Sequence, residues 1–118
     1  MNSKITVVRK YKFESAHHLT CVPEGHPCRR LHGHSYKMWV HVTGPVENYM
    51  VMEYGDIDAI VDPIVEKYLD HHDLNLYIDE PTVEMIIQWV WDKLEPDLPG
   101  LCKIRIQETE RAWVEIER

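Results

Sequence analysis

Apolar and polar residues alternate along two early segments of the chain, a pattern typical of strands with one buried face. Residues 5–14 are rich in β-branched and aromatic side chains, and the alternation returns in residues 34–43 before Gly44-Pro45 ends it. Residues 20–30 lie between them and contain two prolines and a glycine, which predicts a loop. The positions that share the predicted core face are Ile5, Val7, Tyr11 and Phe13 in the first strand, and Tyr36, Met38, Val40 and Val42 in the second.

From Ile57 the apolar residues follow the repeat of an amphipathic helix. Pro63 interrupts this stripe, so we expect a kink or a restart there, with Asp62 as the cap. A second helix is predicted to begin near Pro81-Thr82, because Thr82 can cap it and proline suits a first turn. The two stripes are Ile57, Ile60, Val61, Ile64, Val65 and Tyr68, and then Val83, Ile86, Ile87, Val90, Trp91 and Leu94.

Two short strands are predicted at the end of the chain, over residues 101–108 and 113–117. The order strand, strand, helix, helix, strand, strand predicts an α+β fold with both helices on one face of an antiparallel sheet. A chain of 118 residues is expected to form a single domain over residues 1–118. Four strands leave two open edges, and pairing with neighbouring subunits is a natural way to cover them.

Composition excludes several classes of function. The chain is 44% hydrophobic and 28% charged, has no apolar run long enough for a membrane span, and shows no signal peptide ahead of the first strand. Its three cysteines lack framework spacing, which favours a reducing compartment, and we expect a cytoplasmic protein without a membrane partner. A net charge of -7 argues against a nucleic-acid partner, although Arg29, Arg30 and a metal ion could still attract a small anionic substrate.

The segment Cys28-Arg29-Arg30-Leu31-His32-Gly33-His34 carries the clearest chemical signal. In an extended backbone His32 and His34 point to the same face, and neutral imidazole is the commonest metal-binding side chain. A short His-x-His motif alone favours ordinary surface or core histidines over metal ligands, and the rest of the chain shifts this balance. A catalytic zinc site usually has three protein ligands, and His17 is best placed to be the third if the first two strands form a hairpin.

Three further histidines and two of the cysteines are interpreted as structural. His18 would face away from His17. His26 lies in the loop, and His41 lies on the outer face of the second strand. Cys21 is a loop thiol, and Cys102 is expected to be a small core residue.

Cys28 has two interpretations. As a fourth ligand beside three imidazoles it would complete a closed, inert metal site. As a free thiol it could act as a base or nucleophile, because Arg29, Arg30 and a nearby cation would lower its pKa.

Two further groups suit acid–base chemistry. Asp70-His71 places a carboxylate next to an imidazole with a near-neutral pKa, although such a pair also suits a solvated helix end. Glu108 ends an apolar strand face, where a carboxylate needs a partner because burying it alone is costly. Their occurrence with a thiol and three histidines in one small domain favours the functional interpretation.

Several motifs, in order over nearly the whole chain, resemble the 6-pyruvoyltetrahydropterin synthase / 6-carboxytetrahydropterin synthase family. The resemblance implies the tunnelling fold (T-fold), in which trimers close their sheets into a barrel and two trimers stack as a hexamer, with active sites between subunits. The motifs are Phe13-Glu14-Ser15-Ala16-His17, Cys28 with His32-Gly33-His34, Leu69-Asp70-His71-His72, Pro81-Thr82-Val83-Glu84 and Glu108-Thr109.

The resemblance also implies roles for individual residues, and it takes Cys28 off the metal. Zinc would polarise the side-chain hydroxyls of the substrate as a Lewis acid. The implied roles are zinc ligation by His17, His32 and His34, proton removal by Cys28, a relay by Asp70 and His71, and pterin anchoring by Glu108.

Three residues separate Cys28 from His32. This gap resembles the bacterial and archaeal 6-carboxytetrahydropterin synthases of the 7-deazaguanine (queuosine) pathway. The implied reaction converts 7,8-dihydroneopterin triphosphate and water to 6-carboxy-5,6,7,8-tetrahydropterin, acetaldehyde and triphosphate. The alternatives are the pyruvoyl-forming activity of the same fold and a non-catalytic zinc- or pterin-binding module.

Overall fold

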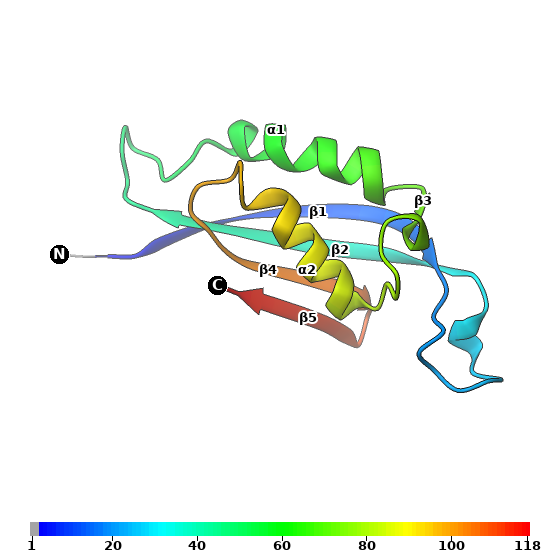
Figure 1. The fold of residues 1–118 in the computed structure, drawn as a ribbon. Helices are drawn as coiled ribbons and strands as arrows, with labels where there is room; N and C mark the ends of the chain where they lie inside the picture. Colours follow the sequence, from blue (N-terminus) through cyan, green and yellow to red (C-terminus); the bar gives the residue numbers. More distant parts are fainter. Residues whose placement is uncertain (1–2) are drawn as a thin grey trace.

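The computed structural model describes residues 3–118 as a sheet with two helices packed on one face (Figure 1). The loop between the first two strands extends beyond the end of the sheet, at the lower right of the figure. The elements are β1 (Ile5–His17), a 3₁₀ turn (Pro27–Arg29), β2 (His32–Gly44), α1 (Tyr54–Ile64), a π-helical turn (Val65–Leu69), β3 (His72–Asp73), a 3₁₀ turn (Leu74–Leu76), α2 (Val83–Leu94), β4 (Leu101–Thr109) and β5 (Ala112–Glu117).

The strands lie in the order β3-β1-β2-β4-β5. β1 and β2 pair antiparallel along their whole length, from Ile5 opposite Gly44 to His17 opposite His32. The predicted α+β class is confirmed, but the sheet has a fifth strand that the sequence pattern did not predict. β3 is only two residues long and pairs parallel with Ser15 and Ala16. Two residues carry no periodicity, so only tertiary contact identifies them as a strand.

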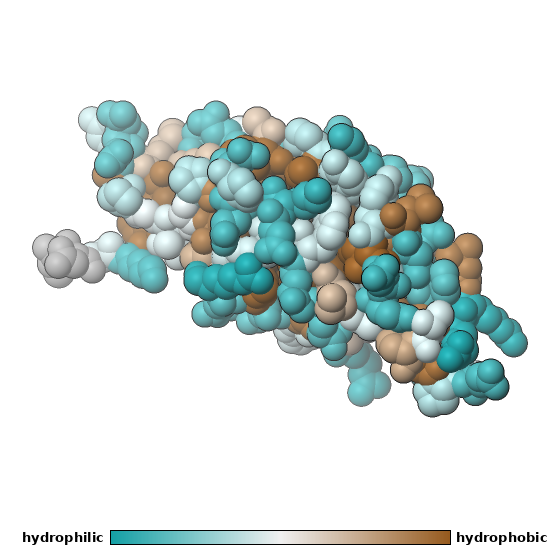
Figure 2. Space-filling model, viewed as in Figure 1, coloured by the Kyte–Doolittle hydropathy of each residue, from teal (hydrophilic) through white to brown (hydrophobic). Residues whose placement is uncertain are grey.

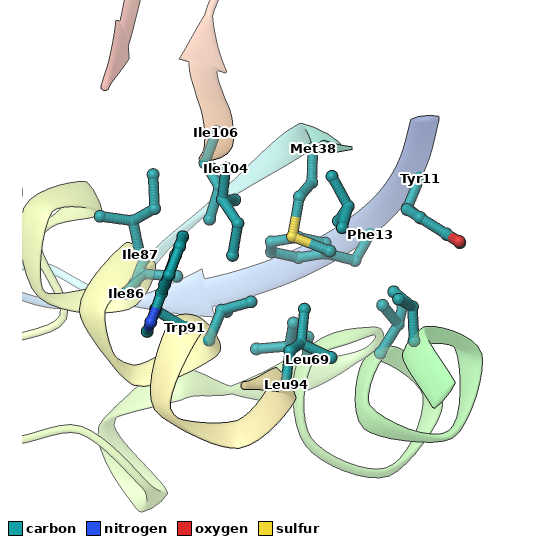
Figure 3. Packing of buried hydrophobic residues seen from close by; sticks show 14 of the residues in the cluster. Tyr11, Phe13, Met38, Leu69, Ile86, Ile87, Trp91, Leu94, Ile104 and Ile106 are labelled. Carbon is teal, nitrogen blue, oxygen red and sulfur yellow. The ribbon is translucent and has the colours of Figure 1, made fainter. Parts of the chain in front are cut away.

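The core lies between the helices and the inner face of the sheet. Met38 and Val40 of β2 are fully buried on the predicted parity, and they pack with Phe13 and with Trp91 of α2. In Figure 3 the side chains of Phe13, Met38 and Trp91 converge from both layers, while the Tyr11 hydroxyl lies at the margin. The alternation of apolar residues therefore predicted the buried face of β2 and of β1 from Tyr11 onward, but Ile5, at the start of β1, is 46% exposed rather than part of the core.

Of the two alternatives expected at Pro63, a kink or a restart, the helix does not restart there. α1 runs from Tyr54 to Ile64 with Pro63 inside it, and its cap is Glu53, whose carboxylate accepts from the Asp56 N–H at 3.2 Å. Asp62 is therefore not a cap. The next turn is π-helical, and the Asp70 N–H donates to the Val65 carbonyl at 2.7 Å. Proline removes one backbone donor, and the helix accommodates this loss by a change of hydrogen-bonding pattern.

Cys102 is not a core residue as expected. The β2–β4 register shifts between His41 and Val42, and Cys102 lies opposite this irregularity. Its thiol donates to the His41 carbonyl at 3.5 Å, and the residue is half-buried outside the apolar cluster. A bulge changes which face a side chain takes, so strand parity fails at this position.

The surface on the helix side is mostly hydrophilic, with separate apolar patches (Figure 2). Within residues 3–118, no helix combines the length and the apolar character that crossing a bilayer requires.

Candidate metal centre and surrounding site

The β1–β2 hairpin brings three histidines together at one end of the sheet. His17 pairs with His32, and His34 lies opposite Ser15, one step along the same inner face. One ring nitrogen from each of the three histidines lies within 4.8 Å of the others. His17 is fully buried, and the other two are half-buried. His17 and His32 lie on opposite sides of the long loop in sequence, and the register of the β1–β2 pairing brings them together.

Backbone carbonyls fix the orientation of two of these rings. Nδ1 of His17 lies 2.7 Å from the Pro81 carbonyl, and Nδ1 of His32 lies 2.7 Å from the Arg30 carbonyl. A carbonyl only accepts, so each Nδ1 carries the hydrogen and each Nε2 presents a lone pair when the ring is neutral. This arrangement of an outer hydrogen bond and an inward ring nitrogen is typical of histidines that bind metals.

The two inward nitrogens lie close enough for one cation to bind both of them. Nε2 of His17 is 3.0 Å from Nε2 of His32. Two lone pairs at that distance repel each other, and a shared cation removes the repulsion. The residues present therefore fit a metal ion held by His17, His32 and His34.

Burial keeps the imidazoles in the form that binds metals. It lowers the pKa of His17 and His34, because the charged imidazolium loses hydration. Glu108 opposes this shift at His34, where its Oε1 lies 3.9 Å from Nε2. The carboxylate therefore lies beside the histidines, at the edge of the candidate metal centre.

Tyr36 is a neighbour of this centre that the sequence pattern identified only as a core residue. Its ring lies 5.6 Å from that of His34, and it is 1% exposed. Among residues 3–118 its hydroxyl has no hydrogen-bond partner. Burial and the charge of Glu108 raise its pKa, so the phenol stays protonated. Periodicity predicts burial but cannot reveal whether a buried hydroxyl finds a partner.

Cys28 lies on the 3₁₀ turn in the long loop and is half-buried. Its N–H donates to Nδ1 of His26 at 3.1 Å, and its carbonyl accepts from the Leu19 N–H at 2.8 Å. The sulfur is not among the donor atoms that cluster within residues 3–118. The histidine group is thus a three-ligand arrangement here, and His26 caps the turn that carries the thiol.

Asp70 and His71 form a hydrogen-bonded pair that is not part of the three-histidine group, although His71 and His34 line the same surface pocket. Nδ1 of His71 lies 2.9 Å from the Asp70 carboxylate, which also accepts from the Glu14 N–H at 2.9 Å. The bond from Glu14 and then the bond from His71 lower the pKa of Asp70. His71 has a φ of 59° and its side chain is 79% exposed. Within one chain this pair therefore points to solvent rather than into the metal centre.

Comparisons with known proteins agree with this fold and identify the family. The family model described as 6-pyruvoyl tetrahydropterin synthase matches residues 6–118. The chain is 40% identical over 112 residues to 6-carboxy-5,6,7,8-tetrahydropterin synthase of Synechocystis, covering 87% of this chain and 85% of that one. It is 31% identical to dihydroneopterin monophosphate aldolase of Pyrococcus furiosus, over 97% and 98% of the two chains. The structure of Caenorhabditis elegans 6-pyruvoyl tetrahydropterin synthase superimposes with a TM-score of 0.87 at 20% identity, covering 98% of this chain and 96% of that one.

Proposed function

The chain belongs to the 6-pyruvoyl tetrahydropterin synthase family, and we propose that it is a zinc-dependent lyase of the 6-carboxytetrahydropterin synthase type. Its reaction would convert 7,8-dihydroneopterin triphosphate and water to 6-carboxy-5,6,7,8-tetrahydropterin, acetaldehyde and triphosphate, as a step of 7-deazaguanine synthesis. The observation that carries the proposal is the three-histidine cluster, in which two inward ring nitrogens lie 3.0 Å apart. The similarity to the Synechocystis protein supports the choice of product.

His17, His32 and His34 would hold the Zn²⁺. When bound there, the ion would polarise the side-chain hydroxyls of the substrate and acidify the neighbouring C–H. Neutral imidazoles suit zinc, and the three-ligand arrangement leaves room for a substrate oxygen.

The other residues would bind the pterin and move protons. Cys28 would take a proton from the substrate side chain. Glu108 would anchor the pterin ring, because a carboxylate can accept from two adjacent N–H groups of the ring at once. Asp70 would orient His71, and the exposed imidazole would relay the proton.

The open strand edges support an oligomer with its sites between subunits. β1 is paired by β3 only at Ser15 and Ala16, so most of that edge is free within the chain. β5 is the opposite edge, and four of its six residues are exposed. Pairing of β5 of one copy with β1 of the next would close a barrel of three or more chains. We also infer a cytoplasmic protein, which suits its three free thiols.

Product analysis tests the chemistry. Zinc-loaded protein is mixed with 7,8-dihydroneopterin triphosphate, and the products are identified by mass spectrometry. A 6-carboxy pterin with acetaldehyde supports the proposal. A 6-pyruvoyl product indicates the rival synthase, and a 6-hydroxymethyl pterin indicates the aldolase activity for which the Pyrococcus relative is named. Unchanged substrate with zinc still bound indicates a binding module.

Subunit mixing tests the location of the active site. The variants Cys28→Ala and His71→Ala are each expected to be inactive as pure oligomers. If the thiol of one copy works with the imidazole of its neighbour, co-expressed mixtures regain activity at about a quarter of their sites. Mixtures that stay inactive contradict shared sites.

A further inference from the structure

The loop that carries Cys28 is braced internally. The Leu19 N–H donates to the Cys28 carbonyl at 2.8 Å and closes the base of the loop. Arg29 bridges the opposite strand of the loop, because Nη2 donates to the Thr20 carbonyl and Nε to the Val22 carbonyl, each at 3.0 Å. The position of Cys28 is therefore tied to the position of Thr20 and its neighbours.

Glu80 holds this braced loop from a distant part of the chain. Its carboxylate accepts from the Thr20 N–H at 3.0 and 3.2 Å, from the Thr20 hydroxyl, and from the Cys21 N–H at 3.3 Å. The two sides of this contact are about 60 residues apart in sequence. Bonds from Thr20 lower the pKa of Glu80 to about 2, so the carboxylate is ionised at neutral pH. Charge-assisted hydrogen bonds of this kind are stronger than neutral ones.

The residue after Glu80 contacts the metal centre. The Pro81 carbonyl accepts from Nδ1 of His17 at 2.7 Å. Thr82 then caps α2, with its hydroxyl accepting from the Met85 N–H at 3.3 Å. One short segment at the start of a packed helix thus touches both the thiol loop and a histidine of the metal centre.

We propose that Glu80 is a positioning residue that sets the place of Cys28 relative to the three histidines. The link runs from Glu80 through Thr20 and Arg29 to the thiol, and through the next peptide to His17. The catalytic meaning of this placement rests on the proposed function, because it assumes that Cys28 acts on a substrate held at the metal. The mechanical part of the proposal needs no substrate. Asn75 is a second tie nearby, but it bonds to His18 rather than to the loop residues that Glu80 holds.

The thiol itself reports on loop position without turnover. In a Cys21→Ser background, the alkylation rate of Cys28 by iodoacetamide is followed by mass spectrometry for the parent, Glu80→Ala and Asp79→Asn proteins. Asp79 is the matched control, because it is adjacent, exposed and equally charged. We expect alkylation to change several-fold in Glu80→Ala and to stay at the parent rate in Asp79→Asn. An unchanged rate in Glu80→Ala overturns the proposal, even if the parent shows no turnover.

Turnover then separates positioning from general stability. In Glu80→Ala we expect kcat to fall about 10- to 100-fold, because small misplacements of a reacting group have effects of this size. KM and zinc content should remain near the parent values, and Glu80→Asp should restore part of kcat. Parallel loss of zinc, far-ultraviolet circular dichroism and kcat, without rescue by Glu80→Asp, would indicate a merely structural role and overturn the proposal.

Discussion

The inner face of the β1–β2 hairpin changes character along its length. Near the middle, Phe13 stacks on Tyr36 with ring centroids 5.0 Å apart, and apolar helix residues cover them. At the end, His17 is buried just as deeply but is surrounded by polar groups. There the Pro81 carbonyl takes the His17 hydrogen bond, and the Leu69 carbonyl takes that of the Ser15 hydroxyl. Burial alone therefore does not decide polarity; nearby backbone acceptors make a buried polar end possible.

The hydroxyl groups of Tyr11 and Tyr36 show the same contrast between the two regions. The Tyr11 hydroxyl donates to the Asp58 carboxylate at 2.6 Å, and Arg9 holds the same carboxylate with Nε at 3.0 Å. The hydrogen bonds from Arg9 and Tyr11 to Asp58 connect β1 to α1. The Tyr36 hydroxyl lies next to the metal centre and has no partner within residues 3–118. The helix contact is complete within one chain, whereas the end of the sheet leaves polar capacity for a ligand.

The largest expected effect is loss of activity without loss of structure at the polar end. Cys28→Ala should lower kcat about 100- to 10,000-fold, because it removes the proposed proton acceptor. Zinc content, measured by elemental analysis, should remain one ion per chain. Cys21→Ala is the matched control in the same loop and should keep near-wild-type turnover. Near-wild-type kcat in Cys28→Ala contradicts the assigned role, and loss of zinc would indicate that the thiol is a ligand.

In the middle of the sheet we expect the reverse effect, a loss of stability without a loss of zinc binding. Ile104→Ala should destabilise the protein by about 2–5 kcal/mol, because it leaves a cavity in a fully buried position. Urea unfolding of the metal-free protein measures this change. The folded fraction should still bind zinc with wild-type affinity, since Ile104 lies opposite Val40, six residues along β2 from His34. A large drop in zinc affinity of the folded variant would show that the two regions are coupled.

Removal of the hydroxyl group should lower the free energy of unfolding at Tyr11 but not at Tyr36. Tyr11→Phe removes a hydrogen bond to a charged group and should cost about 1.5–3 kcal/mol in the free energy of unfolding. Tyr36→Phe should be neutral or stabilising by up to about 1 kcal/mol, because its hydroxyl is buried without a partner. Both are measured by urea unfolding without metal. Equal destabilisation by the two variants would show that the Tyr36 hydroxyl is satisfied after all.

The smallest effect is a pH dependence at the Glu80 contact. The pKa of Glu80 is about 2 in the folded protein, against 4.5 for an ordinary glutamate. The unfolded chain binds more protons between these values, so the stabilising contribution is complete above pH 4.5 and declines as the pH falls toward 2. The difference in urea midpoint between wild type and Glu80→Gln should therefore be constant near neutral pH and shrink in acid. A difference that grows on acidification, or that Asp79→Asn reproduces, contradicts this origin.

The sequence by itself determined much of this protein. Strand alternation predicted the buried face of β1 and β2, and the Thr82 cap of α2 follows from local chemistry. His17, His32 and His34 could be grouped from strand parity, and the motif order placed the chain in its family. These inferences succeed because side-chain direction in a strand has a fixed period, and because a cap depends on neighbouring residues.

Tertiary structure alone decided the rest. No local pattern reveals that the Pro81 carbonyl meets His17, that Glu80 reaches Thr20, or that Tyr36 lacks a partner. The bulge at Cys102 broke the expected strand period for the same reason. Each depends on groups distant in sequence, whose approach is set by the packing of the helices on the sheet.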